Sequence, residues 1–85
     1  MASEQSLFQD LVVLLDKTIE DLIPEEVQPD SDLKDDLGID SLARLEVVAA
    51  IEERWGIKIP DEDADELHTV RQTVRYIDQA ASTST

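Results

Sequence analysis

Apolar residues recur at the spacing of an α-helix in three separate stretches of this chain. In the first stretch, which ends before Pro24, they are Leu7, Leu11, Leu14, Leu15, Ile19 and Leu22. In the second, which follows Gly38, they are Val47, Val48, Ile51 and Trp55, with Leu45 at the margin. In the last they are Val70, Val74, Ile77 and Ala81. This period predicts amphipathic helices that pack through their apolar sides.

Local signals predict where two of these helices begin and end. Ser6-Leu7-Phe8-Gln9 has the form of a capping box, so we expect the first helix to open there. It should end near Ile23, because Pro24 disfavours helical geometry in the residue before it. Thr69-Val70-Arg71-Gln72 is a second capping box. It predicts a last helix that ends near Ala81.

The segments between the helices are predicted to be irregular. The connection from Pro24 to Ile39 is long for so small a domain and is expected to include a helical turn around Ser31 to Asp36. It has three candidate core residues, namely Leu33, Leu37 and Ile39. Ile57-Lys58-Ile59 alternates like a strand but lacks a partner, so it should place two isoleucines in the core. Asp61 is expected to cap a short helix that continues to about Glu66.

These elements predict an all-α fold, a compact four-helix bundle with three longer helices, one short helix and a long first loop. The 85 residues make one small domain, residues 1–85, which we expect to be a monomer. Residues 82–85 are small and polar, and both they and residues 1–5 are expected to fray.

The charge balance and the residue types that are absent limit the classes of function. The chain has 21 acidic and 7 basic residues, a net charge of -14, which disfavours nucleic acid and membrane surfaces and favours partners with basic surfaces. Met1–Gln5 lacks the features of a signal peptide, and no segment is apolar enough to span a membrane, so we expect a cytoplasmic protein. Cysteine is absent, so any thiol chemistry needs a thiol brought from outside.

The start of the second helix offers one candidate attachment site. Gly38 breaks regular structure and Asp40 is suited to cap a helix, so the helix should begin at about residue 40 with Ser41 in its first turn. Backbone N–H groups there lack intrahelical partners and carry partial positive charge. An anionic group on the Ser41 oxygen, such as a phosphodiester, would be favoured.

A candidate docking surface begins beside Ser41. At 100° per residue, one narrow stripe of the second helix carries Leu42, Glu46, Ala49 and Glu53, and we call these four residues the acidic stripe. It would suit a partner with an apolar pocket ringed by Arg or Lys, although an ordinary solvated face has the same composition. Arg44 projects onto the apolar side and is expected to reach solvent along the core edge.

The sequence offers no catalytic or metal site. Ser41 would need a base to act as a nucleophile, and no triad-like pattern surrounds it or the one histidine, His68, to which we assign no function. Two aspartate-rich segments only partly match a calcium loop. One begins at Asp61 but has Glu66 where glycine is required, and the one that begins at Asp30 departs from the pattern earlier. We therefore expect neither an enzyme nor a metal site.

The run Leu37-Gly38-Ile39-Asp40-Ser41-Leu42, together with Glu46 and the segment from Glu52 to Asp63, resembles the acyl carrier protein family. The resemblance extends from about Leu7 to Ala81. It implies a four-helix fold and a 4′-phosphopantetheine arm on Ser41, which a separate phosphopantetheinyl transferase takes from coenzyme A. Acyl intermediates would be held on this arm as thioesters.

The resemblance also implies partners and the surface that they recognise. Acyltransferase, ketosynthase and other pathway enzymes would recognise the second helix through Asp40, Leu42, Glu46 and Glu53. An apolar gap between helices would shelter the acyl chain of the cargo, with candidate lining residues Val47, Ala50 and Ile51.

Three residues depart from the commonest fatty-acid pattern. Ala43 stands where an acidic residue is frequent, Arg44 adds positive charge, and Ala49 replaces a larger apolar residue. These departures favour a polyketide or related specialised pathway over fatty-acid synthesis. An aminoacyl or peptidyl carrier is an alternative, although such carriers often have glycine in place of Asp40. The second alternative is an unmodified acidic helical adaptor that binds a basic partner.

Overall fold

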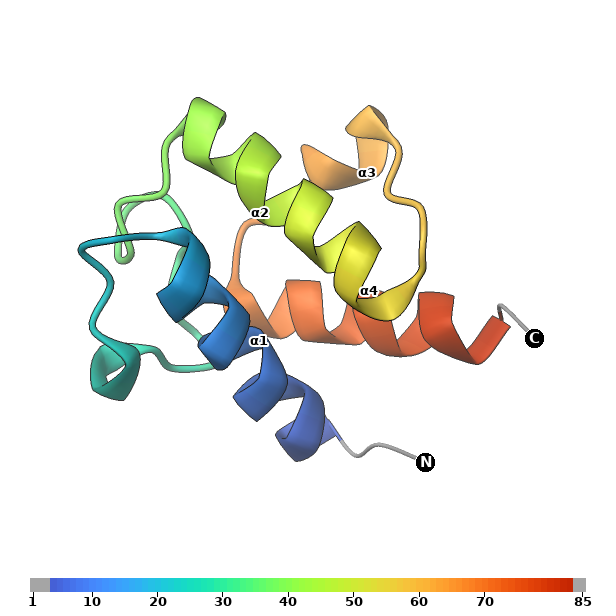
Figure 1. The fold of residues 1–85 in the computed structure, drawn as a ribbon, viewed down its shortest axis with the longest axis horizontal. Coiled ribbons are helices and arrows are strands. Elements are labelled where there is room, and N and C mark those ends of the chain that lie inside the picture. Colours follow the sequence, from blue (N-terminus) through green and yellow to red (C-terminus); the bar gives the residue numbers. More distant parts are fainter. Residues whose placement is uncertain (1–3, 84–85) are drawn as a thin grey trace.

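The computed structural model describes residues 4–83, and within them the fold is all-α with no strand (Figure 1). The elements in chain order are α1 (Glu4–Thr18), the short 3-10 helix η1 (Pro24–Glu26), α2 (Ser41–Trp55), α3 (Asp61–Ala64) and α4 (Val70–Thr83). Three longer α-helices and a short one confirm the predicted four-helix fold. Of the frayed ends expected from the sequence, residues 1–3, 84 and 85 lie outside the described residues, whereas residues 4, 5, 82 and 83 belong to helices.

The core lies where the three longer helices meet. Its most deeply buried side chains come from α1, α2 and α4, and they are Leu11, Leu15, Ile51, Val70 and Ile77. α1 packs against both α2 and α4, and in Figure 1 the long connection lies on the side opposite the start of α1 and the end of α4. Burial of this apolar surface is the main term that stabilises the bundle.

The long connection is held against the start of α4 by backbone hydrogen bonds. The N–H of Leu33 donates to the carbonyl of His68 at 2.8 Å, and the N–H of Val70 donates to the carbonyl of Ser31 at 3.1 Å. Leu33 and Ile39 are buried and Leu37 is partly buried, as the spacing predicted. These contacts fix the path by which the chain reaches α2.

The helical turn expected around Ser31 to Asp36 is a hydrogen-bonded turn and not a helix. Residues 33–37 form a turn with two i to i−4 bonds, from Asp36 N–H to the Asp32 carbonyl and from Gly38 N–H to the Lys34 carbonyl, both at 3.0 Å. Gly38 follows with φ of +70°, a conformation that costs a residue with a Cβ about 1–2 kcal/mol. The reversal at Gly38 directs Ile39 back into the core.

The predicted bounds of the first helix are wrong at both ends. α1 already includes Glu4, so Ser6 lies inside the helix and does not cap it. α1 ends at Thr18, five residues before Ile23. Pro24 disfavours helical geometry only in the residue before it. It therefore limits how far the helix can extend, but it does not make the helix continue to Ile23. Thr18, the last residue of the helix, donates its Oγ1 hydroxyl to the Leu14 carbonyl at 2.8 Å.

The signals around the other helix ends are mostly confirmed. Gly56 ends α2 in the left-handed conformation, and Ile57 and Ile59 are buried. The capping box of α4 is present, with Thr69 Oγ1 accepting from Gln72 N–H at 3.2 Å and Gln72 Oε1 accepting from Thr69 N–H at 3.1 Å.

The short helix α3 differs from its prediction. Asp61 is its first helical residue and not its cap, because the carbonyl of Pro60 accepts the N–H groups of Asp63 and Ala64 at 3.0 Å each. The helix ends at Ala64, with Asp65 as its C-cap, and does not reach Glu66.

Polar contacts attach α3 to the helices on either side. Tyr76 Oη donates to Asp63 Oδ2 at 2.7 Å, which ties α3 to α4. Asp65, just after α3, accepts from the Arg44 guanidinium of α2 at 2.6 Å. None of the described helices is both long enough and apolar enough to cross a membrane.

Candidate functional site

Ser41 is held in place by its two preceding residues. Ile39 is 2% exposed and anchors the end of the connection in the core. Asp40 has extended backbone geometry, and its Oδ1 accepts the N–H of Ala43 at 2.8 Å. The predicted cap is therefore confirmed, and Ser41 becomes the first residue of α2. A buried anchor followed by a capped helix gives the Ser41 side chain a fixed position.

The Ser41 side chain is exposed at this corner of the bundle. Among the described residues, no hydrogen bond engages its hydroxyl, and none joins it to His68. The hydroxyl is thus accessible to an external reagent, and no base in the described part of the chain is hydrogen-bonded to it so as to activate it.

A pocket of about 240 Å³ opens beside Ser41. Its wall brings together residues that are distant in sequence, including Lys34 from the long connection, Arg44 from α2 and His68 from the segment before α4. Sequence reasoning assigned nothing to Lys34 or His68, because their proximity to Ser41 depends on the path of the connection. The backbone bond between Leu33 and His68 is the contact that brings the two segments together.

The acidic stripe is solvent-exposed along its whole length. Leu42 is 71% exposed, and Glu46, Ala49 and Glu53 are exposed as well. Leu45, placed at the core margin by its spacing, is 61% exposed, and that prediction is wrong. The buried residues of α2 are Val47 and Ile51, so the other helices cover only a narrow part of its circumference. Leu45 therefore adds apolar surface close to Leu42.

The two glutamates of the acidic stripe are not engaged by the arginines. Four ion pairs lie in the described part of the chain, and their acidic partners are Asp65, Asp10, Asp30 and Glu4. None of these acids belongs to the stripe. Arg44 is half-buried and reaches solvent to pair with Asp65, as its position at the core edge predicted.

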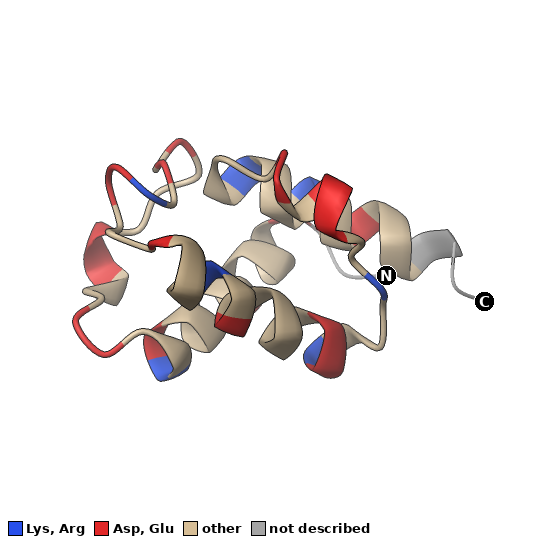
Figure 2. Ribbon diagram, turned by 90° about the horizontal axis from the view of Figure 1, so that it is seen from above, with Lys and Arg blue, Asp and Glu red and all other residues tan. Residues whose placement is uncertain are grey.

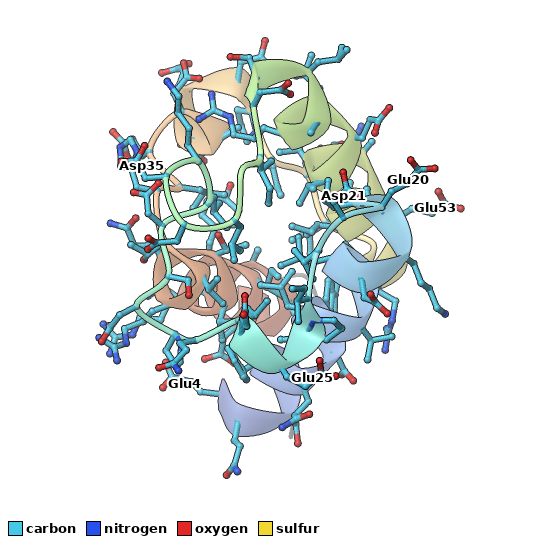
Figure 3. All side chains as sticks on the ribbon, turned by 90° about the vertical axis from the view of Figure 1, so that its left-hand side faces the viewer. Glu4, Glu20, Asp21, Glu25, Asp35 and Glu53 are labelled. Atoms are coloured by element: carbon cyan, nitrogen blue, oxygen red, sulfur yellow. The ribbon has the colours of Figure 1, made fainter. Side chains whose placement is uncertain are left out.

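Acidic residues are spread over the helices and the connections between them, and Lys and Arg are fewer (Figure 2). The labelled carboxylates of Glu4, Glu25, Asp35 and Glu53 point away from the protein interior in Figure 3. Negative charge at this density attracts basic surfaces over a distance of about 10 Å at 0.1 M salt.

The acidic residues of the long connection shape its turn. Asp32 Oδ1 accepts the N–H groups of Asp35 at 2.8 Å and Lys34 at 2.9 Å, and Asp36 Oδ2 accepts the N–H of Asp32 at 2.7 Å. The hydrogen bonds from Asp35 and Lys34 lower the pKa of Asp32, because they stabilise its charged form. Residues 4–83 hold no group of three or more His, Asp or Glu side chains arranged to bind a metal ion.

Of the candidate lining residues, Val47 and Ile51 are buried in the core and Ala50 is half-buried. Their packing against neighbouring helices accounts for this burial, so a role in sheltering an acyl chain stays a prediction.

Residues 11–77 match a family model described as a phosphopantetheine attachment site. The chain is similar to the acyl carrier protein of Streptomyces coelicolor, with 56% identity over 81 residues, which cover 95% of this chain and 88% of the relative. It is also similar to the meromycolate extension acyl carrier protein of Mycolicibacterium aurum, with 40% identity over 76 residues, 89% of this chain and 77% of the relative.

A third relative, the acyl carrier protein of Micrococcus luteus, is 38% identical over 80 residues, which cover 94% of this chain and 98% of that protein. The match therefore extends over the capped helix start, the exposed serine and the helices that position it. This chain belongs to the acyl carrier protein family, as a carrier of polyketide or fatty-acid type that uses 4′-phosphopantetheine as its cofactor and interacts with pathway enzymes and a phosphopantetheinyl transferase.

Proposed function

We propose that Ser41 is the residue that bears the 4′-phosphopantetheine arm. The observation that carries this proposal is the exposed, unbonded hydroxyl at the first position of a capped helix, inside the segment that matches the attachment-site family. The local field supports it too, because the free N–H groups in the first turn of α2 favour a phosphodiester anion.

The modification needs a partner enzyme. Ser41 Oγ attacks the phosphorus of coenzyme A that is linked to pantetheine. An Oγ–P bond forms, the P–O bond to 3′,5′-adenosine bisphosphate breaks, and that group leaves with the electron pair. The hydroxyl proton passes to a base of the transferase, since no base within residues 4–83 is hydrogen-bonded to Ser41. When bound, the arm supplies a terminal thiol that this cysteine-free chain lacks and that holds an acyl group as a thioester.

The chain's own contribution is to position the arm and to bind the enzymes that use it. Tethering replaces free diffusion of the acyl group by a high effective concentration at each partner site. A rigid attachment point defines the region that the arm can reach. The buried Ile39 and the Asp40 cap provide that rigidity.

We infer that partner enzymes dock on Asp40 and the acidic stripe. The exposed Leu42 fits an apolar pocket, and the unpaired Glu46 and Glu53 fit a rim of Arg or Lys around it. Ala49 between them leaves room for close approach of a partner surface. Acyltransferase, ketosynthase and the transferase that loads the arm are the enzyme classes that this surface serves.

The finer assignment is a single-domain, monomeric, cytoplasmic carrier without catalytic activity of its own. The alanines at positions 43 and 49 and the cation at Arg44 favour a polyketide or related specialised pathway. They remove one acid and add one positive charge near the arm, which changes the set of basic partners that bind well.

Mass spectrometry tests the attachment site. The purified chain is incubated with coenzyme A and a promiscuous phosphopantetheinyl transferase, and we expect one added phosphopantetheinyl group. Ser41→Ala should abolish the addition, whereas Ser6→Ala, which changes an exposed serine on α1, should leave it complete. Circular dichroism confirms that both variants are folded.

Two results would contradict the proposal. The wild-type chain could remain unmodified, which would favour an adaptor without an arm. Alternatively, Ser41→Ala could still gain the full mass, which would place the arm on another residue.

A further inference from the structure

The pocket beside Ser41 brings two basic side chains and the one histidine together on a strongly acidic protein. Lys34, Arg44 and His68 border it, and we call it the cationic pocket. The chain has only 7 Lys and Arg residues and one His at a net charge of -14, so two of the seven cations and the one histidine surround this opening. Its deeper wall is apolar and comprises the buried Leu33, Ile39 and Leu67.

The two acidic residues of the cationic pocket are occupied by backbone groups. Asp40 Oδ1 accepts the Ala43 N–H at 2.8 Å, and Asp32 Oδ1 accepts two N–H groups of the turn that follows it. Hydrogen bonds from N–H groups offset part of the carboxylate charge. One oxygen of each carboxylate is thereby held by backbone groups.

Arg44 can turn toward a new anion without a large loss of stability. Its guanidinium pairs at 2.6 Å with Asp65, whose side chain is 72% exposed. Exposed ion pairs of this kind are worth about 0–1 kcal/mol. Ser41 and Arg44 are three residues apart on α2, and residues at this spacing are neighbours on a helix surface. A phosphodiester on Ser41 would thus lie within the neighbourhood of this guanidinium.

From these observations we propose that the cationic pocket holds the phosphodiester and the adjacent pantoyl group of the arm. The proposal rests on attachment of the arm at Ser41. Lys34 and Arg44 attract the phosphodiester anion, the His68 ring offers an N–H donor, and the apolar wall contacts the two methyl groups of the pantoyl unit. The charge of the anion and the apolar methyl groups next to it match the two kinds of surface that the pocket offers.

This placement leaves the acidic stripe free for partner enzymes. At 100° per residue, Arg44 projects roughly 180° away from the centre of the stripe around the axis of α2. The first part of the arm would therefore lie on one side of the helix while partners dock on the other. The thiol end extends beyond the pocket into solvent.

Amide chemical shifts measured by NMR test the proposal on fully loaded protein. Mass spectrometry first verifies that the sample is completely modified, so a failure of attachment is recognised separately. We expect the amides of Lys34, Leu67 and His68 to shift between the unmodified and the loaded forms. These shifts should shrink when salt is raised to about 1 M, where the Debye length falls to about 3 Å.

Variants of residues that border the pocket complete the test. Lys34→Gln combined with His68→Gln should reduce the shift at Leu67, whereas Arg75→Gln, which removes a cation paired with Glu4 on another part of the surface, should not. Shifts confined to residues 40–43, or spread through Val47 and Ile51 in the core, would overturn the proposal. If the double variant fails to fold, the salt response of the wild-type shifts decides the question.

Discussion

The carboxylate of Asp40 and the backbone N–H of Ala43 are joined by a hydrogen bond of 2.8 Å that fixes the start of α2. Because this bond satisfies one of the free N–H groups of the first turn, the helix begins at Ser41 and not one turn later. Ile39, on the other side of Asp40, is buried. The position of the Ser41 hydroxyl therefore depends on a cap and an anchor that are adjacent in sequence.

Removal of the cap should destabilise the domain. We expect Asp40→Ala to lower the free energy of unfolding by about 1 kcal/mol, the typical cost of losing a side-chain cap. Asp40→Asn should cost only a few tenths of a kcal/mol, because asparagine caps helices about as well as aspartate. Urea denaturation followed by circular dichroism measures both values. Equal losses in the two variants would show that the charge of Asp40, and not its hydrogen bond, is responsible.

The contrast between Ile51 and Leu45 gives a test of how α2 packs. Ile51 is 1% exposed and Leu45 is 61% exposed. Ile51→Ala should therefore cost about 2–5 kcal/mol through lost burial and the cavity that remains. Leu45→Ala should change stability by about 0.5 kcal/mol or less, as is usual at surface positions. A large loss on Leu45→Ala in denaturant unfolding would mean that this leucine packs against the core in solution.

The pKa of Tyr76 reports the attachment of α3 to α4. Its hydrogen bond to Asp63, together with partial burial, raises the pKa of Tyr76 from 10.0 to about 12, because both favour the neutral phenol. The folded pKa is above the unfolded one. The stabilising contribution of the phenol is therefore complete below pH about 10 and is lost as the pH rises through about 12.

Absorbance titration of tyrosinate measures this pKa directly, since the chain has one tyrosine. Asp63→Asn should return the pKa toward 10.0, because the hydrogen bond to the charged carboxylate is the largest cause of the shift. Asp61→Asn, at an exposed acid of the same helix, serves as the matched control and should leave it raised. An unchanged value in Asp63→Asn would show that the contact is not formed in solution.

Charge reversal on the acidic stripe should slow transfer to partner enzymes. Glu46→Lys combined with Glu53→Lys replaces attraction by repulsion toward a basic rim, so we expect association to slow on the order of tenfold at low salt. Stopped-flow transfer kinetics at several salt concentrations measure this effect. Glu25→Lys with Glu26→Lys makes the same charge change on η1, away from α2. Equal slowing in both pairs would indicate a general effect of net charge and contradict docking on the stripe.

The success of the sequence-based predictions follows the range of the interactions concerned. The Asp40 cap, the Gly56 helix end and the Thr69–Gln72 capping box are confirmed, and each depends on groups within a few residues of one another. The end of α1 at Thr18 was mispredicted because a proline sets only an upper limit on a helix. The exposure of Leu45 was mispredicted because it depends on how wide an arc of α2 the other helices cover.

Sequence alone determined that this chain forms amphipathic helices and that a serine stands at the capped start of one of them, because helical period and capping are local properties of the chain. Tertiary structure decided which residues surround that serine. Lys34 and His68 are 34 residues apart in sequence and border one pocket with Ser41, because backbone bonds hold the long connection against the segment before α4. Such contacts depend on packing between distant segments, which no local pattern encodes.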